Sequence, residues 1–358
     1  MQTNNAFSQL VAMNKKYPDI KETFKKMQHQ HLTGKNKKGV FCPSHIIPTL
    51  STEMDRMTRK HLMINQDIKS LFNDTELGSF CAAYTHEAHL FGTWRNSLGV
   101  YRIDEEILQE TIKSAIPDDT PSAIFSRLPD WCVYIELPEM GEYDKDGLAV
   151  SFRGFWALLD EKIYNMKSGQ SQLVLNIIPD YDANFDRGYN TYIPIQMAVD
   201  DSLTVAQSIE KVKQLNQQVV KLIDGTDDFD EDRHNKHNAV LRHLLPILLW
   251  LCAEEPDITN INGEPVTRSE LSAPKHGINK KTGSFVPPSQ PIVYNIGQRL
   301  GGEIRTFNED NSGNNGRAST RKRPHIRRGH WHGVWRGTGQ NKHFHTYWQP
   351  AVFVNAKP

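Results

Sequence analysis

Apolar residues in the first part of the chain recur at the spacing of one helix face. They do so between residues 7 and 11, between residues 20 and 27 beyond Pro18, between residues 54 and 72, and between residues 81 and 91. Because proline interrupts a helix, the first two groups predict two short helices. Residues 1–130 are therefore predicted to form a helical N-terminal region.

The pattern changes between residues 131 and 199 to short runs rich in β-branched and aromatic residues. These runs read WCVYIEL, LAVSFRGFWALL, QLVLNII and YIPIQMAV, and turn-forming stretches separate them. Strands that follow one another through turns pair most simply with their neighbours in sequence. We therefore expect an antiparallel meander in the middle of the chain.

Two helices and a long loop follow the predicted meander. Thr204 and Gln207 have the spacing of a capping box, which predicts that a helix starts here. A second helix is predicted from His237 to Ala253, and its apolar run LLPILLWLCA, which contains Pro246, is too short to cross a membrane. A loop rich in Pro, Gly, Asn and Lys then leads to a strand at IVYNIG. Residues 131–307 are thus predicted to form a mixed α/β body.

The C-terminal region reads as a linker followed by a β-hairpin. Residues 308–323 have the composition of a flexible basic linker, and residues 324–358 form two alternating runs around a turn at residues 337–340. Alternation predicts that four aromatic residues share one face and form a layer against the body, namely Trp331, Trp335, Phe344 and Trp348. The other face is predicted to carry His330, His332 and Arg336, together with His343, His345 and Tyr347. The predicted fold class is α+β.

Charge is unevenly distributed along the chain. Its 358 residues include 42 Lys plus Arg and 42 Asp plus Glu, so the net charge of zero gives no general attraction to nucleic acid or to a membrane surface. No acidic residue follows Asp310, and the last 48 residues carry nine lysines and arginines. Four widely separated cysteines and the lack of a signal-peptide pattern predict free thiols in a reducing cytoplasm.

The polar face of the hairpin has three interpretations. It can be an ordinary solvated surface. It can contact RNA or the ribosome, with basic side chains neutralising phosphates and aromatic rings stacking on bases; the residues proposed for this role are Arg321, Lys322, Arg323, His325, Arg327, Arg328, His330, His332 and Arg336. Alternatively, His330, His332 and Arg336 can act as acid, base and phosphate clamp of a metal-independent ribonuclease, because imidazole titrates near neutral pH.

Other motifs give weaker signals. A structural zinc site normally includes cysteine at closer spacing, so neither a metal nor a cofactor is predicted. The glycine-rich run GQRLGG at Gly297 is expected to lack the flanking strand and helix of a phosphate-binding loop. Glu254, Glu255 and Asp257 could hold a divalent ion, but acidic residues in a turn are more often simply solvated.

Several long strings of the chain carry a resemblance to a known family. They read GTWRNSLGVYRIDEEIL from Gly92, DDTPSAIFSRLPDWCVYI from Asp118, LLPILLWLCAEEPDI from Leu244, PKHGINKKTGSFV from Pro274 and RPHIRRGHWHGVWRGTGQ from Arg323, with shorter matches at GFWALLD, IGQRLGGEIR and WQPAVFV. Together they resemble the type V-A anti-CRISPR family that lowers synthesis of the type V-A effector nuclease. The resemblance implies recognition of the nascent N-terminal polypeptide of that nuclease at the ribosome, followed by loss of its mRNA.

Three hypotheses for the mechanism remain. The protein can be a non-catalytic adaptor that brings cellular ribonucleases to the translating ribosome, an endoribonuclease itself, or a direct blocker of the nuclease channel. The basic tail favours the adaptor over the channel blocker, which should present an acidic face. For the peptide contact we expect Trp94, Arg95, Tyr101 and Trp131, because aromatic residues beside arginine anchor short peptides. A second basic contact is expected at Lys275, His276, Lys280 and Lys281.

Overall fold

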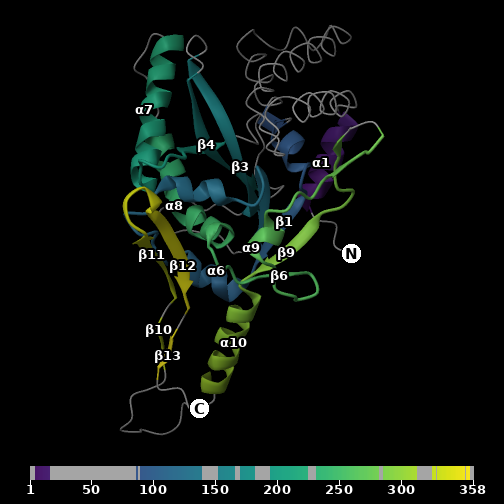
Figure 1. Ribbon diagram of the computed structural model, residues 1–358, viewed down its shortest axis with the longest axis vertical. Helices are drawn as coiled ribbons and strands as arrows, with labels where there is room; N and C mark the ends of the chain where they lie inside the picture. Colours follow the sequence, from purple (N-terminus) through teal and green to yellow (C-terminus); the bar gives the residue numbers. More distant parts are fainter. Residues whose placement is uncertain are drawn as a thin grey trace.

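The computed structural model describes residues 5–16, 86–87, 89–138, 152–165, 170–181, 194–224, 231–281, 285–312, 325–327, 329–350 and 352–354. Within these residues the fold is α+β, as predicted, and is built on a mixed seven-stranded sheet with the strand order β5-β4-β3-β2-β1-β9-β6. Figure 1 shows this sheet between helices, with the C-terminal hairpin beside α8. No helix in this described part of the chain is both long and apolar enough to span a membrane.

The predicted antiparallel meander forms one half of the sheet. It consists of β2 (Cys132–Glu136), β3 (Phe152–Asn165), β4 (Gln170–Tyr181) and β5 (Ile195–Ala198). Each of these strands pairs antiparallel with the next. Local alternation and turn-forming residues were therefore sufficient to predict this half of the fold.

The other half of the sheet is made by strands that lie far apart in the sequence. β1 (Gly99–Ile103) pairs in parallel with both β2 and β9 (Ile292–Ile296), and β6 (Ile258–Asn260) closes the edge antiparallel to β9. The strand at IVYNIG is thus confirmed. β1, however, lies within residues 1–130, which were expected to be helical, so the sheet crosses the predicted boundary at residue 130. A short buried strand between helices carries no helical or alternating signal of its own.

α7 (Val205–Asp224) begins where local capping chemistry predicts. It starts directly after Thr204, whose backbone N–H donates to Gln207 Oε1 at 2.9 Å, while the Gln207 N–H donates to Thr204 Oγ1 at 3.4 Å. This is the predicted capping box. The second predicted helix is also present as α8 (Glu231–Cys252), which starts earlier than expected and contains Pro246. Of the predicted N-terminal helices, α1 (Asn5–Lys16) and a helical segment at residues 89–94 are described, and the others lie outside the described residues.

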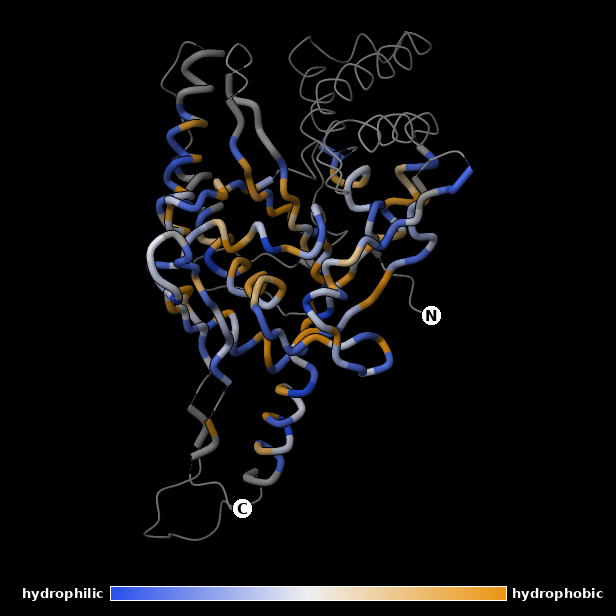
Figure 2. Tube along the Cα trace, in the orientation of Figure 1, coloured by the Kyte–Doolittle hydropathy of each residue, from blue (hydrophilic) through white to orange (hydrophobic). Residues whose placement is uncertain are grey.

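Two hydrophobic cores lie on the two faces of the sheet. α1 and residues 89–94 cover one face, where Trp94 and Trp156 are buried. The other face is covered by α8, α6 (Glu105–Thr111), η2 (Ser122–Arg127) and α10 (Gln298–Ser312). The C-terminal half of α8 is apolar on all sides because it packs between the sheet and the hairpin. Figure 2 shows hydrophobic residues concentrated where the strands and α8 meet, and hydrophilic residues on the outer segments.

Smaller elements complete the described part of the chain. α9 (Arg268–Leu271) has a complete capping box at its N-terminus, and β7 (Gly277–Ile278) pairs with β8 (Phe285–Val286). The C-terminal hairpin comprises β10 (His325–Arg327), β11 (His330–Arg336), η3 (Gly339–Asn341), β12 (His343–Gln349) and β13 (Val352–Val354). α10 runs to Ser312, so the first residues of the expected flexible linker are helical, and residues 313–324 lie outside the described part.

Candidate functional site

The two strands of the C-terminal hairpin pair in the register that sorts its side chains as predicted. Trp331 lies opposite Trp348 and Trp335 opposite Phe344, so these four aromatic residues share one face. His332 lies opposite Tyr347 and Arg336 opposite His343, which places the histidines and the arginine on the other face. Side-chain alternation in an antiparallel pair is a local property, which is why the sequence alone could predict it.

Aromatic packing attaches the hairpin to the body. The rings of Trp250, Trp331 and Trp348 form a triangle in which the ring centroids are 5.2 to 5.3 Å apart. Trp331 is 3% exposed; its indole Nε1 donates to the Pro246 carbonyl at 3.0 Å, and its backbone N–H donates to Ser114 Oγ at 3.1 Å. These contacts fix the hairpin against α8.

The predicted aromatic layer is only partly buried. Phe344 is buried, and Trp348 is partly buried against the same core as Trp331. Trp335 is 43% exposed, although it lies on the same face and only four residues after Trp331. The expectation that all four rings pack on the body is therefore wrong for Trp335, because the hairpin tip extends beyond the surface that covers Trp331.

Polar contacts reinforce one side of the docked hairpin. Arg127, at the end of η2, donates from Nη2 to the Phe344 carbonyl at 3.0 Å. His345 Nδ1 lies 2.7 Å from Glu254 Oε2, and Arg127 Nη1 lies 3.8 Å from Glu254 Oε1. Neither His345 Nδ1 nor Arg127 Nη1 is oriented to form a hydrogen bond with Glu254, so these two contacts are electrostatic only. Glu254, considered above as an ion ligand, thus belongs to the hairpin contact, and the described residues contain no group of three or more His, Cys, Asp and Glu that could hold a metal ion.

The outward face of the hairpin forms a row rather than a catalytic cluster. His330, Arg336 and His343 are exposed, and the Tyr347 ring contacts both His332 and His345, with centroids 5.2 and 5.4 Å away. Residues two apart on a strand are separated by roughly 6.6 Å along it, so His330 and His332 stand beside each other on an open surface. A surface of this kind is suited to contact a chain of phosphates and bases along its length.

The structure describes only part of the predicted basic surface. His325 and Arg327 belong to β10, where they pair with Val354 and Val352 of β13. Arg321, Lys322, Arg323 and Arg328 lie outside the described residues.

The four residues expected to contact a peptide do not form one surface. Trp94 and Tyr101 are fully buried, and they belong to the cores on opposite faces of the sheet. The Trp94 indole donates to the Gly99 carbonyl at 3.0 Å, Arg95 is buried, and Trp131 is partly buried against the Tyr101 core. A peptide that contacted all four would have to open both cores.

The second expected basic contact divides into a buried part and an exposed part. Lys275 has a side chain that is only 4% exposed, and its Nζ lies 3.4 Å from Asp130 Oδ2. Burial raises the pKa of Asp130 to about 6, against the opposing charge of Lys275. Burial also lowers the pKa of His276. Lys280 and Lys281 are exposed and precede β8, so only these two can reach a partner directly.

The glycine-rich run at Gly297 does have a strand before it and a helix after it, contrary to the sequence expectation. β9 ends at Ile296 and α10 begins at Gln298, with Gly297 at a φ of 73° between them. A carboxylate already occupies the start of this helix, because the Leu300 N–H donates to Asp257 Oδ2 at 3.1 Å. Asp257 therefore caps α10, and the motif is not a free phosphate cradle.

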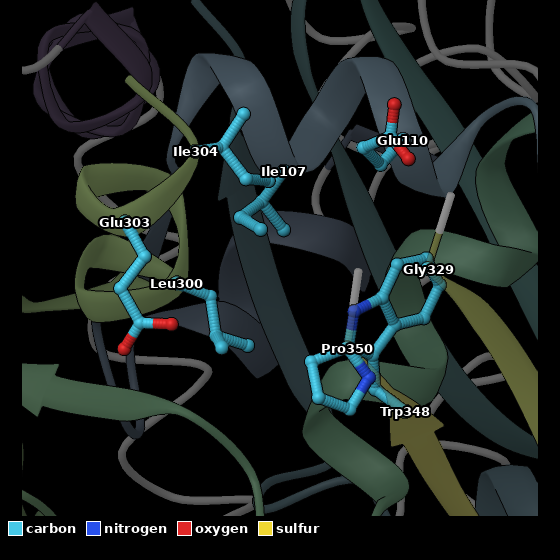
Figure 3. A pocket seen from close by; sticks show the side chains of 8 residues that line it. All are labelled: Ile107, Glu110, Leu300, Glu303, Ile304, Gly329, Trp348 and Pro350. Atoms are coloured by element: carbon cyan, nitrogen blue, oxygen red, sulfur yellow. The ribbon is translucent and has the colours of Figure 1, made fainter. Parts of the chain in front are cut away.

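A small pocket lies at the base of the hairpin (Figure 3). It is lined by Ile107, Glu110, Leu300, Glu303, Ile304, Gly329, Trp348 and Pro350. Its lining comes from α6, α10 and the hairpin, and Glu110 Oε2 is buried there without a hydrogen-bond partner among the described residues. No sequence signal pointed to this pocket, because three segments distant in sequence build it.

Comparisons with known proteins give one consistent result. A sequence model described as the AcrVA2-like, anti-CRISPR type V subtype A2 family matches residues 101–356. A solved structure titled "Crystal structure of AcrVA2" is similar with a TM-score of 0.70 and 34% sequence identity, over 99% of this chain and 100% of that one. No curated protein matches the chain. The matched region begins within β1 and includes the rest of the sheet, α8 and the docked hairpin.

Proposed function

The chain belongs to the anti-CRISPR type V subtype A2 family, and from this premise we propose that it lowers the amount of the type V-A effector nuclease by acting on its synthesis. In this proposal the body binds the nascent N-terminal polypeptide of the nuclease, and the hairpin binds ribosomal or messenger RNA. Loss of the mRNA follows through cellular ribonucleases. The protein itself acts as an adaptor.

The observation that supports this proposal is the docked hairpin. The hairpin and the segment before it concentrate the positive charge of a chain with zero net charge, since nine lysines and arginines and no acidic residue lie in the last 48 positions, and five of the nine fall within residues 324–358. The apolar face of the hairpin is used for docking on α8, which leaves the face with His330, His332 and Arg336 turned outward. A direct blocker of a nucleic-acid channel would need the opposite charge on its most charged element.

Two weak contacts on one molecule suffice for this mechanism. A short peptide offers little surface, so its affinity alone is of micromolar order. A tail that is already bound to RNA holds the peptide site near the nascent peptide at an effective concentration of about the millimolar range. The affinity of the whole protein then exceeds the affinity of either contact alone. If about six tail cations contact single-stranded phosphates, the logarithm of affinity falls with the logarithm of salt concentration with a slope of about −4.

A ribonuclease is the alternative function for the same face. It would use His330, His332 and Arg336, but their arrangement in a row along one strand favours binding over cleavage, because acid and base must converge on one phosphate. Purified protein incubated with RNA separates the two functions. The adaptor leaves the RNA intact, whereas a ribonuclease cleaves it and loses that activity in His332→Ala.

The proposed function is tested with a reporter transcript that begins with the opening codons of the type V-A nuclease. Its half-life is measured with and without the protein, for the natural codons, for synonymous codons and for a frameshifted version. We expect destabilisation to survive synonymous recoding and to disappear on frameshift, because the peptide is the signal. Loss of the effect on synonymous recoding would refute peptide recognition and show that the message itself is read.

A further inference from the structure

The hairpin tip presents an aromatic ring to solvent in a basic environment. Trp335 is 43% exposed, whereas Trp331, on the same face of the same strand, is 3% exposed. The exposed ring is not loosely held, since the buried Phe344 contacts it edge to face with centroids 5.2 Å apart and an interplanar angle of 70°. The tip therefore holds an indole in a defined orientation outside the core.

A cation lies over this indole. Lys342 Nζ lies 5.4 Å from the centroid of the Trp335 ring, which is within the range of a cation–π contact. Arg336, the next residue along the strand, and His343 are exposed on the opposite face of the hairpin. No acidic residue is present anywhere from residue 311 to the end of the chain. The ring and the Lys342 ammonium match the two halves of a nucleotide, a flat base and a phosphate.

From this juxtaposition we infer that the hairpin tip binds single-stranded nucleic acid, with a base stacked on Trp335 and the adjoining phosphate at Lys342. A base that enters over the indole takes the position of the Lys342 ammonium and leaves that ammonium beside the adjoining phosphate. Bases in a duplex are already stacked on each other, so the tip selects single strands. The inference deepens the proposed function, on which the choice of RNA as the biological ligand rests, and it adds Trp335 and Lys342 to the contact surface.

The test is a binding titration of the full-length protein with a labelled eight-nucleotide single-stranded RNA. Stacking on an aromatic side chain strengthens nucleic-acid binding enough that Trp335→Ala should weaken it by roughly 5- to 150-fold. Trp335→Phe keeps a ring and should lose much less. Lys342→Gln should reduce the salt slope by about 0.7. DNA of the same sequence should bind comparably, and an RNA duplex should bind clearly more weakly.

A matched control removes an exposed apolar side chain elsewhere. Ile261 is 68% exposed in the turn after β6, and Ile261→Ala should leave RNA affinity unchanged. Circular dichroism and thermal unfolding establish that Trp335→Ala is folded. Unchanged RNA affinity in folded Trp335→Ala, or equal affinity for duplex and single strand, would overturn the inference.

The reporter assay separates this inference from the proposed function. If Trp335→Ala weakens RNA binding but the reporter transcript still decays as with the wild type, the tip binds nucleic acid and the proposed role of the tail is refuted. If the reporter is stabilised while RNA affinity is unchanged, the role of the tail is supported and base stacking at the tip is refuted.

Discussion

The docking of the hairpin depends on one side chain more than on any other. Replacing Trp331 by alanine removes an indole that is 3% exposed, together with its hydrogen bond to the Pro246 carbonyl. A buried tryptophan covers roughly 150–250 Å², which at about 25 cal/mol per Å² corresponds to roughly 4–6 kcal/mol. Truncations of this kind cost about 3–5 kcal/mol, because alanine still buries some surface. We therefore expect Trp331→Ala to destabilise the docked hairpin by about 3–5 kcal/mol.

The loss should be confined to the hairpin. β11 and β12 form a separate two-stranded sheet, and an isolated pair of strands is marginally stable in water. Native-state hydrogen exchange therefore reports docking directly, because the hairpin amides lose protection once the hairpin leaves α8. In Trp331→Ala, amides of β11 and β12 should exchange at least about 100-fold faster, since about 1.4 kcal/mol corresponds to a factor of ten. Amides of β3 and β4 should keep their protection.

Trp335→Ala is the matched control, because it removes the same side chain from the same face of the same strand where it is 43% exposed. Its effect on stability should be clearly smaller than that of Trp331→Ala, because less of the ring is removed from water. Trp331→Phe keeps an aromatic ring and loses the hydrogen bond, so it should cost about 1–2 kcal/mol. Wild-type protection of the hairpin amides in Trp331→Ala would refute the reasoning, as would unfolding of the whole sheet together with the hairpin.

Two further predictions concern the body. Gly297→Ala should destabilise the protein by about 1–3 kcal/mol, because Gly297 has a φ of 73° and an added Cβ would lie 2.7 Å from Ile107 Cγ1. The control is Gly302→Ala in α10, where an added Cβ meets nothing within 4 Å, so this variant should be neutral or stabilising. Urea unfolding measures both effects. Burial raises the pKa of Asp130 from 3.8 to about 6, so its carboxyl binds a proton more tightly in the folded chain. The resulting stabilisation is complete below the pKa that Asp130 has in the unfolded chain, and it is lost as the pH rises through about 6. Asp130→Asn should therefore remove this fall in the free energy of unfolding between about pH 4 and 6. An unchanged pH dependence in Asp130→Asn would contradict the assignment.

The parts of the fold that could be predicted from the sequence are those encoded locally. The capping box at Thr204 and Gln207 fixes the start of α7 through two short-range hydrogen bonds. Alternation in the C-terminal region correctly separated Trp331 and Phe344 from His332 and Arg336. Both signals depend on residues close in sequence, so they are readable without knowledge of the rest of the molecule.

The parts that could not be predicted depend on distant segments. No sequence pattern near Gly99 predicts that β1 lies between β2 and β9, because strands that pair in parallel are joined by long connections. The burial of Trp94 and Tyr101 follows from layers on both faces of the sheet, which a run of aromatic residues beside an arginine does not reveal. The exposure of Trp335 depends on where the body ends beneath the hairpin, a matter of global shape.

The separation of the hairpin into two faces has a consequence for divergence within the family. One face is constrained by Trp250 and the core, and among the residues that the structure describes the hairpin shares no strand ladder with the seven-stranded sheet. Apart from His345, which contacts Glu254, substitutions at alternate positions can therefore change the outward face without disturbing either the docking contacts or the register of the main sheet. Selection can retune the ligand preference of the hairpin while the architecture that carries it stays fixed, because contacts with α8 hold the inward positions and only what the hairpin binds constrains the outward ones.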